Sequence, residues 1–161
     1  MTEPSRFDRF LAQANVAALC VLRVGVGGIM AAHGWAKLSD MSGTAQSFGH
    51  LGLPAPLILV YLAVCGEFMG GLGLLAGLLT RVAALGPACT MVVAILTVHW
   101  GHGLFAKDGG YEYPLVLLLV SVFFAFNGAG PISVDAWLER SEARRLSRPP
   151  RLRQSMPSQP L

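Results

Sequence analysis

Three residues whose side chains exchange protons or donate hydrogen bonds lie near the ends of apolar stretches in this 161-residue chain. His33 and Lys37 are four residues apart, which places both side chains on one face of a helix. His99 ends a later apolar stretch at a similar expected depth. An imidazole and an ammonium group can donate hydrogen bonds to a carbonyl oxygen or exchange protons with it. These residue types therefore indicate a site for a quinone head group or another small polar substrate.

A second polar group, Tyr111, Glu112 and Tyr113, precedes the last apolar stretch. If the apolar stretches form one bundle, these side chains lie at the same outer mouth as the two histidines and the lysine. The other interpretation is that the tyrosines and histidines anchor the protein at the membrane interface, with the lysine ammonium reaching toward water. No catalytic residue is assigned from the sequence.

Two further ionisable residues, Arg23 and Glu67, lie deeper within apolar stretches. A charge inside a membrane helix costs a few kcal/mol unless it is paired or hydrated, which makes each of these residues a candidate site. Their expected depths differ by about 8 Å at the rise of a helix, a gap that the long arginine side chain could partly bridge. We therefore predict an intramembrane Arg23–Glu67 ion pair, with either a functional role or a purely structural one.

Four apolar stretches position these side chains, at roughly residues 16–38, 55–79, 82–105 and 113–130. About 20 apolar residues are needed to cross the hydrocarbon core of a bilayer. With 53% hydrophobic and only 13% charged residues, the composition excludes an ordinary soluble domain. We expect an all-α integral membrane protein, a four-helix bundle, with an N-terminal segment (1–15), a membrane domain (16–138) and a basic, disordered tail (139–161).

The basic residues predict the orientation of the chain. If the four helices alternate in direction, one side carries all of the arginines outside the spans: Arg6, Arg9, Arg81, Arg140, Arg144, Arg145, Arg148, Arg151 and Arg153. The positive-inside rule then places both termini in the cytoplasm. Basic residues next to a membrane favour anionic lipid over nucleic acid, so we expect lipid contacts and no nucleic-acid partner.

Small residues recur at helical spacing in the second stretch. Gly66 and Gly70 are four residues apart, and so are Gly73 and Gly77. This small-xxx-small pattern is typical of a close helix-packing face.

An ordered set of short motifs resembles the DoxX family of small four-helix membrane proteins over roughly residues 16–138. The motifs are Leu22-Arg23-Val24, His33-Gly34-Trp35-Ala36-Lys37, Gly52-Leu53-Pro54, Glu67 with the glycine-rich run into Gly77-Leu78-Leu79-Thr80-Arg81, His99-Trp100, and Gly109-Gly110-Tyr111-Glu112-Tyr113-Pro114. The resemblance implies a role in respiratory or sulfur-linked redox reactions. Related subunits occur in thiosulfate:quinone oxidoreductase, and mycobacterial relatives are linked to a membrane oxidoreductase complex with a superoxide dismutase and a sulfurtransferase-like partner. Other relatives act as membrane chaperones.

The residues and the resemblance together favour an oxidoreductase-system subunit in the bacterial cytoplasmic (inner) membrane. It is not expected to act as an enzyme alone, because the sequence carries no flavin, nicotinamide or iron–sulfur motif. The expected ligand is a quinone or a small sulfur-containing substrate, and redox proteins or a second copy are the candidate partners. The alternatives are a non-catalytic scaffold or chaperone, and a haem or metal protein with His33 and His99 as ligands.

Overall fold

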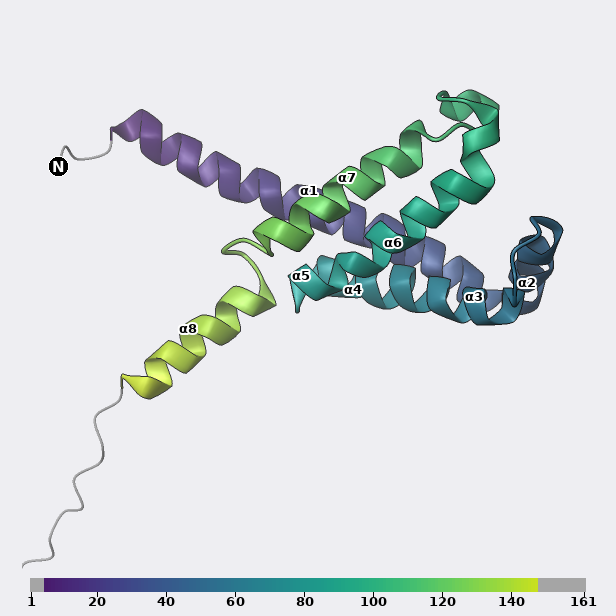
Figure 1. Ribbon diagram of the computed structural model, residues 1–161. Helices are drawn as coiled ribbons and strands as arrows, with labels where there is room; N and C mark the ends of the chain where they lie inside the picture. Colours follow the sequence, from purple (N-terminus) through teal and green to yellow (C-terminus); the bar gives the residue numbers. More distant parts are fainter. Residues whose placement is uncertain (1–4, 148–161) are drawn as a thin grey trace, which may run out of the picture.

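The computed structural model describes residues 5–147, and this part of the chain is helical without any β-strand (Figure 1). The helical segments are α1 (Arg6–Ser39), α2 (Met41–His50), α3 (Pro56–Val64), the π-helical turn η1 (Cys65–Met69), α4 (Gly70–Ala76), α5 (Thr80–Ala83), α6 (Leu85–Ala94), the π-helical turn η2 (Ile95–His99), the 3₁₀ turns η3 (Trp100–His102) and η4 (Ala106–Asp108), α7 (Glu112–Asn127) and α8 (Val134–Leu146).

Three helical runs are long and apolar enough to cross a membrane: Arg6–Ser39, Pro56–Ala76 and Thr80–His102. The second and third are each built from several consecutive segments. The fourth apolar helix, Glu112–Asn127, has 16 residues. At 1.5 Å per residue it is about 24 Å long, a little short of the hydrocarbon thickness. The bundle arrangement in a membrane and the cytoplasmic position of both termini stay predictions.

Helix boundaries differ from the expected ones for local reasons. The first helix begins at Arg6, ten residues before the expected start, because Ser5 and Asp8 form a capping box at its N-terminus. The second apolar run ends at Ala76 because Gly77 adopts a positive φ of 68°, which terminates the helix. The last apolar helix ends at Asn127, where Gly128 has a φ of 76°.

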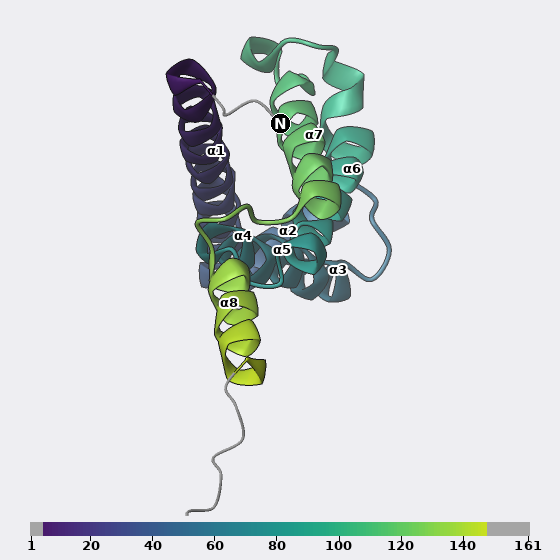
Figure 2. The same cartoon turned by 90° about the vertical axis from the view of Figure 1, so that its left-hand side faces the viewer.

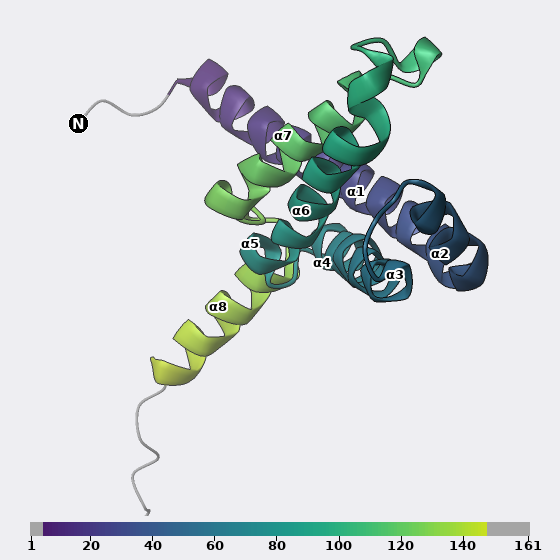
Figure 3. The same cartoon turned by 45° about the vertical axis from the view of Figure 1, so that its right-hand side comes forward.

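The run from α3 to α4 lies between two neighbours, with α1 packed on one side and α6 on the other. Helix α7 packs along α6 in the opposite direction (Figures 1 and 2). The short helix α2 lies beside α3, at the end of the molecule where α1 stops (Figure 3). We call this the distal end, and the opposite end, where α4 stops and α8 begins, the terminal end.

Glycines allow these helices to approach at backbone distance. A Cβ added to Gly27 of α1 would lie 2.6 Å from the Leu75 amide nitrogen and 2.8 Å from the Gly71 carbonyl oxygen. On the other side, a Cβ on Gly86 of α6 would lie 2.6 Å from the Gly66 carbonyl oxygen. These glycine contacts lie within the chain, so the expected close packing face joins its own helices.

The terminal end is closed by α8. The Asp135 carboxylate accepts hydrogen bonds from the amides of Leu79 (2.7 Å) and Thr80 (3.0 Å) at the start of α5. The Asp135 amide donates in turn to the carbonyl oxygen of Gly77 at 2.9 Å. The expectation of disorder from residue 139 is therefore wrong as far as Leu146, since α8 is helical to that residue. The rest of the expected tail, residues 148–161, lies outside the described residues.

The close crossing of α1 and α4 predicts an asymmetric response to two alanine substitutions in the same helix. Gly27→Ala should lower the free energy of unfolding by about 1–3 kcal/mol because the new methyl group has no space. Gly25→Ala is the matched control, since its Cβ meets nothing within 4 Å. Thermal unfolding in detergent compares the two variants. Equal melting temperatures would contradict the backbone contact.

The cap formed by Asp135 predicts pH-dependent docking of α8. Burial raises the pKa of this carboxyl, but the hydrogen bonds from Thr80 and Leu79 together with the positive charge of Arg23 outweigh burial and hold the pKa below its ordinary value. The cap therefore stabilises the protein above pH 4 and is lost as the pH falls through the lowered pKa of the folded protein.

Removal of this carboxylate by Asp135→Ala should destabilise the protein at pH 7 by about 1 kcal/mol, as expected for a helix cap. The difference from wild type should disappear at acidic pH, where the wild-type carboxyl is protonated. Asp108→Ala is the control, because Asp108 is exposed and makes only a 4.0 Å contact with Lys107. A constant difference between wild type and Asp135→Ala at every pH would refute the assignment.

Candidate functional site

A buried carboxylate is the centre of the site. Glu67 lies in the π-helical turn η1, and only 4% of the residue is exposed. Its Oε2 atom accepts a hydrogen bond from the Lys37 Nζ atom of α1 at 2.5 Å. The lysine side chain is 24% exposed and reaches the carboxylate from the distal end. The two charges thus form an ion pair within the apolar part of the molecule.

The predicted Arg23–Glu67 ion pair is wrong, because each residue has another partner. Arg23 is buried, and its Nη1 atom donates to the carbonyl oxygens of Leu74 (2.7 Å) and Leu75 (3.3 Å). Its Nη2 atom donates to the Ile132 carbonyl oxygen at 2.8 Å. These carbonyls at the end of α4 carry the negative end of the helix dipole, which suits a guanidinium. Arg23 therefore joins α1, α4 and the segment before α8.

One close approach explains why lysine reaches Glu67. A Cβ on Gly34 would collide with the backbone of Phe68, the residue after Glu67. Gly34 and Lys37 are three residues apart and share a face of α1. Trp35 packs against the Phe68 ring at a centroid distance of 5.8 Å. The missing side chain at residue 34 thus brings the ammonium group within reach of the buried carboxylate.

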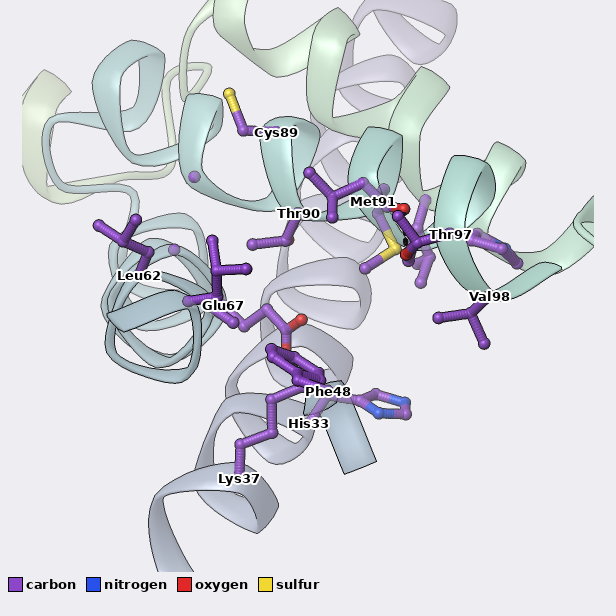
Figure 4. Close-up of a pocket in the computed structure, with 18 of the residues that line it drawn as sticks. His33, Lys37, Phe48, Leu62, Glu67, Cys89, Thr90, Met91, Thr97 and Val98 are labelled. Carbon is purple, nitrogen blue, oxygen red and sulfur yellow. Dashed lines mark hydrogen bonds and ion pairs between the residues drawn. The ribbon is translucent and has the colours of Figure 1, made fainter. Parts of the chain in front are cut away.

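Beside this ion pair lies a pocket of about 620 Å³. Its walls come from α1, α3 with η1, α6 with η2, and the start of α7, and Phe48 of α2 lines its distal end. Figure 4 shows Thr90, Met91 and Thr97 of the α6–η2 wall across the pocket from Glu67. Most of the lining is apolar: Leu53, Leu59, Leu62, Ala63, Met91, Val93, Ala94, Val98, Pro114 and Leu117. An apolar pocket with a few convergent polar groups is typical of a small-molecule site.

Both predicted histidines line this pocket. His33 is exposed, lies one turn before Lys37 on α1, and makes no hydrogen bond to any residue between 5 and 147. His99 is partly buried, and its Nδ1 atom lies 2.7 Å from the carbonyl oxygen of Gly109. If Nδ1 carries the proton of the neutral ring, Nε2 of His99 is an acceptor. The two rings offer different hydrogen-bonding groups to a ligand.

Of the three residues at the start of the last apolar helix, only Tyr113 lines the pocket. Glu112 instead accepts a hydrogen bond from the Ala106 amide at 2.6 Å, which closes the preceding loop. Tyr111 stacks on Trp100 with ring centroids 5.5 Å apart. Tyr111 and Glu112 therefore shape the segment between η3 and α7 (residues 103–111), which we call the distal loop, and the expectation that they share the pocket is not met.

Two wide helical turns position Glu67 and His99, and no sequence pattern predicted these turns. Glu67 lies in η1 and His99 in η2, both π-helical. Such turns insert one residue into a helix, change the direction of the following side chains, and are frequent at functional sites. Sequence reasoning also missed Phe48, Thr90 and Thr97 as lining residues. The only sequence signal for a polar wall was the spacing of Thr90 and Thr97, which are seven residues apart and therefore share one helical face.

The arrangement does not resemble a metal centre. Within residues 5–147, no three His, Cys, Asp or Glu side chains are grouped so that they could hold a metal ion. The polar groups of the pocket instead comprise one ion pair, two imidazoles, a phenol, two hydroxyls and the thiol of Cys89. Such a set can donate hydrogen bonds to carbonyl oxygens and take up or release protons.

The buried ion pair predicts a large loss of stability when only the cation is removed. Lys37→Met leaves the Glu67 carboxylate buried without a partner and should lower the free energy of unfolding by about 3 kcal/mol. Adding Glu67→Gln should recover part of this loss because it removes the unpaired charge. Lys107→Met is the control, and it should change stability by less than about 1 kcal/mol because its pair is exposed. Thermal unfolding in detergent that shows equal effects for Lys37→Met and Lys107→Met would contradict the pair.

Comparisons with known proteins show the family of the chain. A model of the DoxX family matches residues 18–100. The chain is 35% identical over 118 residues to "Putative oxidoreductase CatD" of Bacillus subtilis (strain 168), covering 73% of this chain and 84% of the relative. It is 32% identical over 110 residues to "Inner membrane protein YqjF" of Escherichia coli (strain K12), covering 66% of this chain and 81% of the relative.

A third relative, an uncharacterized protein of Haemophilus influenzae, is 30% identical over 120 residues, covering 73% of this chain and 87% of the relative. No solved structure matches the chain. The family match includes Arg23, Gly34, Lys37, Glu67 and His99, and it ends before the distal loop and α8. By its apolar helices, its family match and these relatives, the chain is a multi-pass membrane protein that belongs to the DoxX family.

Proposed function

We propose that this protein is an integral membrane subunit of an oxidoreductase system and that its pocket binds a quinone. The observation that carries the proposal is the apolar pocket with the Lys37–Glu67 pair and His33 on its wall. A quinone has an apolar ring with two carbonyl oxygens, so it requires apolar contact together with hydrogen-bond donors. The relative named as an oxidoreductase supports the redox assignment, and the relative named as an inner membrane protein supports placement in the bacterial inner membrane.

Reduction of a quinone to a quinol takes up two electrons and two protons. The sequence carries no motif for a flavin, nicotinamide or iron–sulfur cofactor, so a redox partner protein supplies the electrons in this proposal. This chain holds the head group and provides proton-exchanging side chains. His33 donates to one carbonyl oxygen, and the Lys37 ammonium stabilises negative charge that develops on the reduced ring.

The test is the quinone content of protein purified in mild detergent. Wild type should retain close to one quinone per chain. His33→Ala should weaken quinone binding about tenfold, the value of one hydrogen bond of about 1.4 kcal/mol. His50→Ala is the matched control, because His50 is exposed at the end of α2 and does not line the pocket.

The melting temperature shows whether each variant is folded. His33 is exposed and makes no hydrogen bond within the described part of the chain, so its replacement should leave stability unchanged. The proposal would be overturned if purified wild-type protein contained no quinone and did not bind quinone added to it. Equal quinone affinity of the two histidine variants would remove His33 from the site.

A further inference from the structure

Two residues that line the pocket are also on the outer surface of the molecule. Leu62 of α3 is 60% exposed, and Val93 of α6 is 48% exposed. Both lie within helical runs that are apolar enough to cross a membrane. The pocket therefore reaches the surface between α3 and α6, and we expect this surface to face lipid because both helical runs are long and apolar enough to cross a membrane. We call the strip between Leu62 and Val93 the α3–α6 seam.

The seam is closed toward the terminal end and open toward the distal end. It is closed where Gly66 and Gly86 meet, since a Cβ on Gly86 would lie 2.6 Å from the Gly66 carbonyl oxygen. No ligand chain can pass between backbones at that distance. One turn before Gly66, Leu62 lines the pocket and remains exposed, so the helices have separated there. Figure 4 shows Leu62 on the far side of the pocket from Val98.

The charged groups of the pocket lie on one side, and the two exposed lining residues of the seam are aliphatic. Lys37, His33 and Glu67 belong to the side formed by α1 and η1, whereas the seam carries aliphatic side chains. This polarity suits an amphiphile whose head group binds the polar side and whose chain leaves through the seam. A chain that stays in the bilayer is not transferred into water, and lipid is as apolar as the leucine beside it.

We infer that the α3–α6 seam is a lateral portal through which a quinone with a long isoprenoid-type tail enters from the bilayer. The head group then lies beside Lys37 and His33, and the tail remains in the seam between Leu62 and Val93. This inference rests on the proposed quinone site and assigns its ligand class, a quinone whose tail is held in lipid. It also assigns Leu62 and Val93, which make no polar contact with the ligand, as the residues that determine specificity for its tail.

The experiment blocks the seam without touching the polar side. Leu62→Trp and Val93→Trp are combined in one variant, and the matched control combines Ile58→Trp and Val92→Trp. Ile58 is 61% exposed and Val92 is 41% exposed on the same two helices, but neither lines the pocket. Binding of ubiquinone-0, which has no tail, and of ubiquinone-10 is measured for each protein in lipid nanodiscs. Thermal unfolding checks that all proteins are folded.

The seam variant should lose at least tenfold more affinity for ubiquinone-10 than for ubiquinone-0, whereas the control variant should show no such difference between the two quinones. An equal loss of both quinones would mean that the tryptophans fill the head-group site, and it would overturn the portal. Unchanged binding of ubiquinone-10 would also overturn the portal but leave the quinone site intact. Absence of binding of either quinone to wild type would overturn the proposed function and the portal together.

Should the double variant unfold, the single variant Val93→Trp with its neighbour Val92→Trp as control gives the same comparison. Val93 is half-exposed, so a larger side chain has space on the lipid side. A smaller loss of ubiquinone-10 affinity, at least threefold relative to the control, is then expected. Equal affinities of the two single variants would overturn the portal.

Discussion

The structure depends on the backbone contact between α1 and the second apolar run. The helices meet at Gly27 and Gly71, where a Cβ on either glycine would collide with the backbone of the other helix. They meet again where Gly34 lies against the backbone of Phe68. Because they run in opposite directions, one face of α1 follows the second run along its length. Arg23 and Lys37 lie on this face, 14 residues and therefore about 21 Å apart. Arg23 meets the end of the neighbouring helical run, and Lys37 meets Glu67 near its middle.

This arrangement accounts for two cations inside an apolar protein. An unpaired charge in the centre of a membrane helix costs about 3 kcal/mol or more. Arg23 avoids this cost through the terminal carbonyls of α4, and Lys37 avoids it through the Glu67 carboxylate. The first contact secures the terminal end together with the segment before α8. The second leaves a charged pair on the wall of the pocket, where a ligand can reach it.

The pocket follows from the glycines on the second face of the same helical run. Gly66 and Gly86 hold the run against α6 at one level, and beyond this level the two helices separate. The space between them is lined by aliphatic side chains, with the ion pair at one side. A helix with small residues on two faces can thus carry both a tight structural contact and a binding site. The same geometry leaves the pocket open at the surface between α3 and α6.

The amino-acid sequence by itself determined the class of the protein, the approximate position of its apolar helices and the residues that bear charge in apolar surroundings. These properties depend on composition and local pattern, which are present in any stretch of about 20 residues. The sequence likewise indicated His33, Lys37, His99 and Tyr113 as neighbours of one site, and all four line the pocket. The resemblance of its motifs to the DoxX family was confirmed by the family match.

Only the tertiary structure decided which charges pair. Depth along a helix suggested Arg23 as the partner of Glu67, but pairing depends on the rotation of each helix and on how closely the backbones approach. The π-helical turns at Glu67 and His99 change that rotation, and no local pattern specifies them. Tyr111 and Glu112 likewise make contacts within the distal loop, where Tyr111 stacks on Trp100 and Glu112 accepts a hydrogen bond from the Ala106 amide. Partners and pockets are set by contacts between segments far apart in the chain, which spacing along one helix cannot specify.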